Sequence, residues 1–249
     1  MSKRKILILV EGAKTDFRLV KHLLDVYELD EQYEIVSYNT NIYALYNTMF
    51  KNVDPAEISL LEHLREHEPN PVKKQIFNEK YSDILLVFDF DPHDYEFSDE
   101  KILEMSGYFV ESTDMGKLYL NYPMAESFYH MKSIPDYDYN SYTASIMELK
   151  DGLYKRRVNA ESCNRDYRKF AVMKRECNIV IRQNVEKAWL LVGKTNEFHD
   201  NNPGVPTLKD ILLKQLELLH SEKTVAVLCT SAFYIIDYNP KLVLSESDS

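Results

Sequence analysis

The sequence contains few cysteines and no long apolar run, and both absences exclude classes of protein. Its three cysteines, Cys163, Cys177 and Cys229, are scattered among 249 residues without a CxxC pair. A sparse, odd count argues against a disulfide framework or a structural zinc site, and it favours the cytoplasm. No segment approaches the roughly 18 consecutive apolar residues of a membrane span. We therefore expect a cytoplasmic protein that does not cross the membrane.

Positive charge is also scarce. The chain has 30 Lys and Arg against 40 Asp and Glu, a net charge of −10. This balance argues against a passive nucleic-acid binder, because phosphate contacts come from Lys and Arg. The exception is the segment 154–187, where ten basic residues accompany four acidic ones, which leaves −16 for the rest of the chain. An acidic body with one basic segment fits a metal-dependent enzyme that binds phosphate locally.

Two sequence signatures are missing as well. The chain has no GxxxxGK[ST] loop, so any ATP-driven step would need a partner protein. The start, MSKRKILILVEG, has no small-residue cleavage site, and an acidic residue directly follows its short apolar run. We therefore expect a first strand here rather than a signal peptide.

Apolar strands alternate with amphipathic helices in the first half of the chain. Strands are expected at 5–10 and 83–88, where residues 6–10 and 84–88 are continuous apolar runs, typical of strands covered on both faces. Further strands are expected at 33–37 and 117–121, and helices at 15–27 (capped by Thr15 or Asp16), 41–51, 55–66, 98–109 and from near Ala125. This order predicts an α/β fold over residues 1–132, with a parallel sheet flanked by helices.

The second half of the chain has a different pattern. Residues 133–249 are expected to form a mainly helical C-terminal region that contains the basic segment. Helices are predicted over 142–153, 161–173, 176–192 and 207–221, and the apolar stretch 223–237 is ambiguous between strand and helix.

Acidic residues stand directly after two of the predicted strands. Glu11 follows the first strand, and Asp89 and Asp91 follow the strand at 83–88. Ligands of open parallel sheets bind beyond the carboxyl ends of the strands, and residues two apart in extended chain point the same way. Carboxylate oxygens are the ligands that Mg²⁺ prefers. The pattern predicts an Mg²⁺ (or Mn²⁺) site of these three acids, although polar loop residues and helix caps also produce acids at strand ends.

The two acidic strand ends carry a family resemblance. ILILVEGAKTD followed by ILLVFDFDPHD resembles the TOPRIM domain of topoisomerases, bacterial primases, RNA-maturing nucleases and OLD-family nucleases, over about residues 5–130. The step from Glu11 to Asp16, and Asn121-Tyr122-Pro123-x-x-Glu126, most resemble the OLD-like and RloB-like branch, although Asp16 stands where Glu is more usual and Tyr122 is an insertion. The resemblance implies Glu126 as an additional ligand or general base. Without it, Glu126 is an acid at the start of a helix, where carboxylates are favoured.

Other residues near these acids are candidates for supporting or substrate-binding parts. Asp16 and Asp94 could hold the metal ligands in position without binding the metal themselves, or they could cap helices. His93 and His130 could act as general acid or base, because His titrates near neutrality. A structural role is the ordinary alternative for each of them. The candidates for binding substrate phosphates are Lys14, Arg156, Arg157, Arg165, Arg168 and Lys169.

The leading hypothesis for function is an Mg²⁺-dependent TOPRIM nuclease that hydrolyses phosphodiester bonds of DNA or RNA. The resemblance implies antiviral (antiphage) defence with a separate partner ATPase. One alternative is a non-catalytic binding or regulatory module that acts on a protein partner, which the acidic composition favours. Nucleotidyl transfer of the primase kind ranks lowest, because no zinc-binding module is visible. The sequence leaves the oligomeric state open, a homo-oligomer included.

Overall fold

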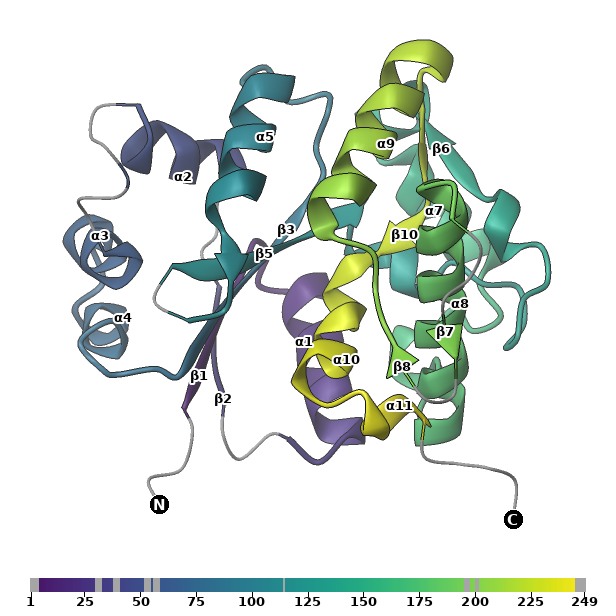
Figure 1. Cartoon of the computed structure of the whole chain (residues 1–249), viewed down its shortest axis with the longest axis horizontal. Helices are drawn as coiled ribbons and strands as arrows, with labels where there is room; N and C mark the ends of the chain where they lie inside the picture. The colour runs from purple at the N-terminus through teal and green to yellow at the C-terminus, as the bar shows by residue number, and fades with distance from the viewer. Residues whose placement is uncertain are drawn as a thin grey trace.

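A six-stranded, mostly parallel sheet runs through the middle of the molecule (Figure 1). The structure is a computed structural model that describes residues 5–29, 33–37, 41–51, 55, 59–113, 115–194, 198–199 and 202–244. The strands are β1 (Ile6–Val10), β2 (Tyr33–Ser37), β3 (Asp83–Asp89), β4 (Val110–Glu111), β5 (Gly116–Tyr122) and β10 (Leu228–Cys229). Their order is β10-β5-β3-β1-β2, with β4 and β10 antiparallel to β5 and the other pairs parallel. The expected α/β class with a parallel sheet is confirmed.

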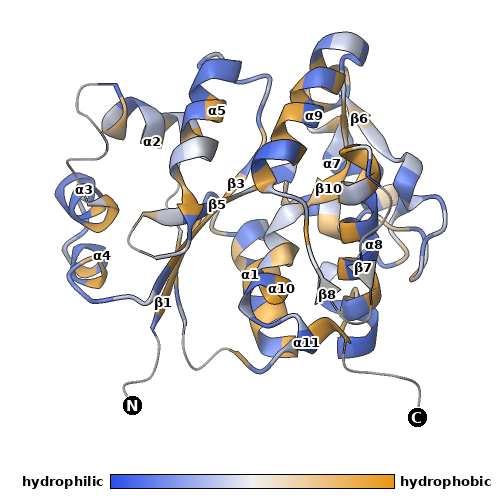
Figure 2. Ribbon diagram, viewed as in Figure 1, coloured by the Kyte–Doolittle hydropathy of each residue, from blue (hydrophilic) through white to orange (hydrophobic). Residues whose placement is uncertain are grey.

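Burial on both faces explains the continuous apolar runs. All five residues of β1 are buried, as are the five central residues of β3. The two strands pair in parallel, with Ile8 beside Leu85 and Val10 beside Val87. Figure 2 shows these strands as a hydrophobic band in the interior, with hydrophilic helix faces outside. The strands therefore fix the register of the sheet through apolar packing.

Helices cover both faces of the sheet. The helices α2 (Ile42–Met49), α3 (Leu60–His67), α4 (Pro71–Ile76) and α5 (Asp99–Tyr108) lie on one side, and α1 (Thr15–Val26) and α10 (Tyr234–Tyr238) on the other (Figure 1). The α3 helix begins later than the predicted 55–66, and positions 56–58 of that prediction lie outside the described residues. No helix in the described ranges is long and apolar enough to cross a membrane.

The predicted caps of α1 are wrong. The helix begins after Lys14 without a side-chain cap. The Thr15 hydroxyl instead donates a hydrogen bond to Glu126, 3.0 Å away. The helix expected from near Ala125 is a short 3₁₀ turn, η3 (Ala125–Tyr129).

The second half is mainly helical, with two differences from expectation. Its helices are α6 (Ile146–Lys150), α7 (Leu153–Glu161), α8 (Lys174–Leu191), α9 (Leu208–Glu222), α10 and α11 (Lys241–Leu244). The predicted helix at 161–173 is wrong, because α7 ends at Glu161 and only a 3₁₀ turn, η5 (Tyr167–Lys169), follows. There Asn164 and Asp166 each accept a hydrogen bond from the N–H two residues onward, which competes with helix formation. The predicted helix at 142–153 begins instead with a strand, β6 (Thr143–Ser145).

The C-terminal region completes the sheet of the first half. The ambiguous stretch 223–237 forms β9 (Thr224–Ala226), β10, the 3₁₀ turn η6 (Thr230–Phe233) and part of α10. Two small sheets pair β6 with β9, and β7 (Phe198–His199) with β8 (Asn202–Pro203). The buried Asn184 of α8 holds β10 in place, since its Oδ1 accepts hydrogen bonds from the Tyr139 hydroxyl at 2.7 Å and the Cys229 N–H at 2.8 Å. All three cysteines are free.

Replacing Asn184 should destabilise the fold. In Asn184→Ala, the Tyr139 hydroxyl and the Cys229 N–H lose their acceptor, at a cost of about 1–3 kcal/mol for each unsatisfied buried group. We expect the free energy of unfolding, measured by urea denaturation, to fall by about 2–4 kcal/mol. The exposed Asn159→Ala on α7 is the control and should change it by less than about 0.5 kcal/mol. Equal stability of the two variants would mean that these hydrogen bonds of Asn184 do not hold β10 in place.

Candidate functional site

The parallel pairing of β1 with β3 brings Glu11 and Asp89 together at the carboxyl ends of the strands. The Glu11 N–H donates to the carbonyl of Val87 at 3.1 Å, which continues the strand pairing by one residue. The Glu11 carboxylate then turns toward β3, and its Oε2 accepts a hydrogen bond from the Asp89 N–H at 3.1 Å. The expectation that these two acids end neighbouring strands is confirmed.

Asp16 reaches the same place from the first turn of α1. Its side chain folds back over Gly12, and a Cβ added to Gly12 would come within 2.7 Å of Asp16 Oδ2. Asp16 is only 6% exposed, and its Oδ1 is buried without a hydrogen-bond partner among the described residues. The missing side chain of Gly12 therefore makes room for a buried carboxyl group.

Glu126 enters from the end of β5. Asp89 Oδ1 accepts a hydrogen bond from the Ala125 N–H at 2.8 Å, which ties the turn after β5 to the end of β3. Glu126 is 1% exposed, and its Oε1 receives both the Thr15 hydroxyl at 3.0 Å and the Lys155 ammonium at 2.8 Å. We call Glu11, Asp16, Asp89 and Glu126 the acid cluster.

Burial and mutual repulsion raise the pKa values of Glu11, Asp16 and Asp89. Burial raises the pKa of Glu11 to about 8; the Asp89 N–H opposes this, and the charge of Asp16 adds to it. Burial, and then the charges of Asp16, Glu11 and Glu126, raise the pKa of Asp89 well above its ordinary value. Burial also raises the pKa of Asp16 to about 6, against hydrogen bonds from backbone N–H groups. The acid cluster therefore resists full ionisation and holds protons that exposed carboxyl groups would have lost.

Asp91 and its neighbours lie beside the acid cluster. Strand β3 ends at Asp89, but the Phe90 N–H still donates to the Asn121 carbonyl of β5 at 2.9 Å, and a turn follows in which the Asp94 N–H donates to the Asp91 carbonyl at 3.2 Å. The Asp91 carboxylate pairs with His93 at 2.7 Å, and its charge still acts on Glu11. Asp94 accepts hydrogen bonds from Asn41 at 2.6 Å and from the Glu96 N–H at 2.7 Å.

His130 does not share a helical face with Glu126. The turn η3 ends at Tyr129, so His130 is its C-cap and the expected spacing of four along a helix is absent. The imidazole is fully buried, and its nitrogens contact the Tyr154 hydroxyl and Glu161, each at 3.1 Å. This places His130 in the packing between η3 and α7.

The predicted phosphate-binding residues fall into different places. Arg157 is bound by Glu148 at 3.1 Å and Glu161 at 3.3 Å, so its charge is compensated within the fold. Arg168 pairs with Asp166 at 2.9 Å and lines a groove together with Lys14. Three further residues of the basic segment, Arg156, Arg165 and Lys169, are exposed.

Lys155 was predicted only as one residue of the basic segment. It lies beside the acid cluster, and the charges of Glu126, Asp89 and Asp16 raise its pKa. Its partner Glu126 stands 29 positions earlier in the sequence and belongs to another element. The local charge pattern indicated that a cation could stand here, but it could not identify the partner.

The acid cluster is not arranged as a closed metal site. Within the ranges that the structure describes, no three His, Cys, Asp or Glu side chains are grouped so that they could hold a metal ion. The reason is visible in the hydrogen bonds, because Glu11 and Asp89 each direct one oxygen at a backbone N–H. The donor atoms are nevertheless the hard carboxylate oxygens that suit Mg²⁺, and the buried Asp16 Oδ1 has no other partner in the described chain.

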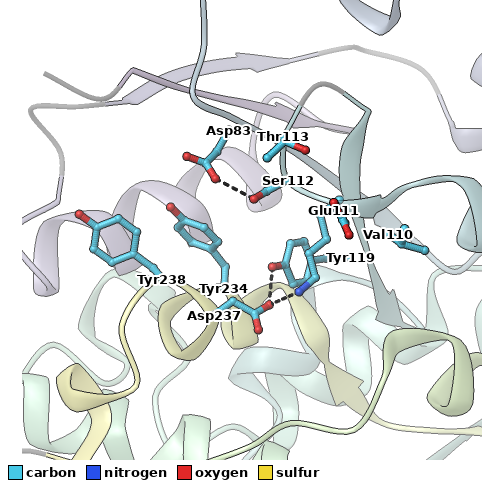
Figure 3. Close-up of a pocket in the computed structure, with 10 residues that line it drawn as sticks. Asp83, Val110, Glu111, Ser112, Thr113, Tyr119, Tyr234, Asp237 and Tyr238 are labelled. Atoms are coloured by element: carbon cyan, nitrogen blue, oxygen red, sulfur yellow. Dashed lines mark hydrogen bonds and ion pairs between the residues drawn. The ribbon is translucent and has the colours of Figure 1, made fainter. Parts of the chain in front are cut away.

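A polar pocket of about 400 Å³ lies at the opposite end of the same strands (Figure 3). Its lining residues bind one another: Ser112 donates to Asp83 at 2.7 Å, while Lys117 and the Tyr119 hydroxyl both contact Asp237 at 2.6 Å. Ligands of parallel sheets bind at the carboxyl ends of the strands. The acid cluster is therefore the stronger candidate for a functional site.

Comparison with known proteins gave no match to a family model, a curated protein or a solved structure. The TOPRIM resemblance stays a prediction, carried by the residues that follow β1 and β3.

The raised pKa of Glu11 predicts a pH dependence of stability. A folded-state pKa of about 8 against an ordinary 4.5 means that the folded chain holds a proton that the unfolded chain has lost between these values. The contribution of protonated Glu11 to the free energy of unfolding is fully present below about pH 4.5 and is lost as the pH rises through 8. In EDTA, we expect the free energy of unfolding of Glu11→Gln, measured by urea denaturation, to rise relative to wild type between about pH 4.5 and 8, by up to about 1.4 kcal/mol per pH unit, and to level off above that range. Glu222→Gln, an exposed change at the end of α9, should show no such trend, and a pH-independent difference for Glu11→Gln would contradict the assignment.

Adding a methyl group at Gly12 should disturb Asp16. Gly→Ala changes usually stabilise by about 0.4–1 kcal/mol where the backbone permits. At Gly12 the new Cβ would meet Asp16 Oδ2 at 2.7 Å, so we expect Gly12→Ala to destabilise by about 1–3 kcal/mol. Gly107→Ala on α5, where the added atom meets nothing within 4 Å, is the matched control and should stabilise.

A double variant tests whether Asp16 causes the destabilisation expected for Gly12→Ala. In an Asp16→Ala background the obstructing carboxyl group is gone, so Gly12→Ala should no longer destabilise, as chemical denaturation of all four chains would show. An unchanged penalty in that background would mean that Gly12 is needed for another reason.

Proposed function

We propose that this chain is an Mg²⁺-dependent nuclease that hydrolyses phosphodiester bonds of DNA or RNA, with the acid cluster as its active site. The observation that carries the proposal is the convergence of four carboxyl groups at the carboxyl ends of the parallel strands, three of them with raised pKa values. Glu11 follows β1, Asp89 ends β3, and Asp16 and Glu126 come from α1 and η3; Lys155 contacts Glu126. A divalent cation would replace the protons of these carboxyl groups, and a phosphate could then approach.

The residues that would hold the metal are Glu11 and Asp89, with Asp16 and Asp91 near enough to act on Glu11. Each of the first two directs one oxygen at a backbone N–H and has a second carboxylate oxygen to offer. When bound, Mg²⁺ or Mn²⁺ would neutralise a phosphate oxygen and lower the pKa of an attacking water.

Glu126 and Lys155 would serve the reaction from the other side of the cluster. Thr15 and Lys155 both contact Oε1 of Glu126, so its Oε2 is the atom positioned to take a proton from water. The Lys155 side chain is half exposed, so its ammonium can also approach a substrate phosphate. The buried environment strengthens each of these electrostatic interactions relative to bulk water.

The setting of the activity rests on the resemblance to the OLD-like and RloB-like branch. We propose antiphage defence in the cytoplasm, where free cysteines such as these are usual. An ATP-dependent step would be supplied by a separate ATPase, because the chain has no phosphate-binding loop of its own.

A non-catalytic regulatory module is the second candidate. Two observations favour it: the net charge of −10, and the hydrogen bonds that satisfy Glu11 and Asp89 without a metal. In that case the acid cluster would bind a cationic group of a partner protein.

A cleavage assay distinguishes the two candidates. The purified chain is incubated with plasmid, single-stranded DNA or total RNA including tRNA, in Mg²⁺, Mn²⁺ or EDTA. We expect metal-dependent cleavage that falls at least about 100-fold in Glu11→Gln and Asp89→Asn, since even outer partners of metal ligands cost about 10–100-fold. Glu222→Gln, an exposed glutamate far along the chain, should cut like wild type.

Titration calorimetry with Mn²⁺ supplies an independent measurement. Wild type should bind Mn²⁺ and Glu11→Gln should not. Binding of Mn²⁺ without cleavage of any substrate would favour the regulatory module. If wild type neither binds Mn²⁺ nor cleaves any substrate, the metal site itself is refuted.

A further inference from the structure

A groove of about 510 Å³ runs along the outer face of α1, next to the acid cluster. It is lined by one side of α1 and by the turn η5, chiefly through Lys14, Phe17, Arg18, Lys21, Tyr167 and Arg168. The four residues from α1 follow helical spacing, so they share one face of the helix. We call this the basic groove.

The groove is positively charged although the protein as a whole is acidic. Four cations line it, against one lining acid, Asp25, and one of the four, Arg168, pairs with Asp166 at 2.9 Å. Lys21 pairs with Asp25 at 2.5 Å, whereas neither Lys14 nor Arg18 forms an ion pair with any residue that the structure describes. A patch of this sign in a chain of net charge −10 attracts an anionic ligand and holds it locally.

Aromatic rings stand among these cations. Phe17 is 37% exposed, so its ring is accessible on this charged helix face. The Tyr167 ring lies flat on the buried ring of Tyr129, with 4.1 Å between centroids and 3° between planes, so it forms a rigid wall. Cations interleaved with accessible rings bind a nucleic-acid backbone and stack its bases.

The groove adjoins the acid cluster through a single helix turn. Thr15 and Asp16 point into the cluster, while Lys14 and Phe17, the residues on either side of them, line the groove. One turn of helix rises only about 5.4 Å. A strand held by Lys14 would therefore continue directly to the carboxyl groups.

From this arrangement we infer that the basic groove binds a single-stranded polynucleotide and leads it to the acid cluster. Lys14 and Arg18 contact phosphates, and one base stacks on Phe17. Single strands are specified because a base inside a duplex is already stacked on its neighbours and cannot cover a protein ring. The inference rests on the proposed nuclease function for what the groove is used for. The binding experiment that tests it does not require cleavage.

Binding is measured by fluorescence anisotropy in EDTA, which separates it from cleavage. The probes are labelled dT15, its RNA counterpart U15, and a dT15·dA15 duplex, each over a range of salt concentrations. We expect both single strands to bind more tightly than the duplex. In Lys14→Glu/Arg18→Glu the affinity should fall at least about tenfold. The negative slope of log K against log salt should become less steep by about 1.4, since each lost single-strand phosphate contact removes about 0.7.

Phe17→Ala separates stacking from charge. It should weaken single-strand binding by about tenfold and leave the salt slope unchanged, because no phosphate contact is lost. The matched charge reversal Lys209→Glu, on the exposed surface of α9, should bind like wild type. Melting temperatures of all variants establish that they are folded.

The outcomes distinguish the groove from the nuclease. Glu11→Gln should bind single strands at least as tightly as wild type, since Glu11 does not line the groove. If groove variants lose binding and wild type cuts nothing, the groove is supported and the nuclease proposal fails. If wild type does not bind, binds duplex equally well, or binds no better than the Lys14→Glu/Arg18→Glu variant, the groove inference is overturned.

Discussion

The parallel pairing of β1 with β3, continued by the hydrogen bond from the Asp89 N–H to the Glu11 carboxylate, is the constraint on which the candidate site depends. The strands are buried on both faces, so their register is fixed by apolar packing and not by the acids themselves. A slip of one residue would turn every side chain of β1 to the other face. It would also separate Glu11 from Asp89. The geometry of the site is thus a consequence of the apolar packing of the sheet, which places Asp89 at the last position of β3 and Glu11 just after β1.

Placing four carboxyl groups at one buried edge is costly, and the structure offsets the cost only in part. Backbone N–H groups of Asp89 and Ala125 bind two of them, and Lys155 binds Glu126. Since burial, and then the charges of neighbouring acids, disfavour the ionised forms, the cluster takes up protons, as the raised pKa values of Glu11 and Asp16 indicate. A fold that served stability alone would gain from apolar residues here, so the cluster has the character of a site kept for binding.

The sequence predicted what depends on local pattern and missed what depends on distant contacts. The apolar runs before Glu11 and Asp89 predicted two buried strands, because burial on both faces leaves a continuous signature. The sequence pattern did not predict that Asp16 folds back over Gly12, since an acid in the first turn of a helix can equally be a helix cap. The pairing of Lys155 with Glu126 requires α7 to pack beside η3, which no local pattern encodes. The helix expected at 161–173 fails for a local reason, the side-chain hydrogen bonds of Asn164 and Asp166, which periodicity does not register.

Helix α1 joins the two charged surfaces of the molecule, and their proximity couples them. Its first turn gives Thr15 and Asp16 to the acid cluster, and the adjacent face gives Lys14 and Arg18 to the basic groove. If the groove binds a polynucleotide and the acid cluster binds a divalent cation, as we propose, the cation would favour the approach of a phosphate to this edge. Because the coupling of two ligands through charge is reciprocal, a strand in the groove would in turn tighten the binding of the cation. The proposed polynucleotide would therefore reach the carboxyl groups chiefly when the metal is already bound.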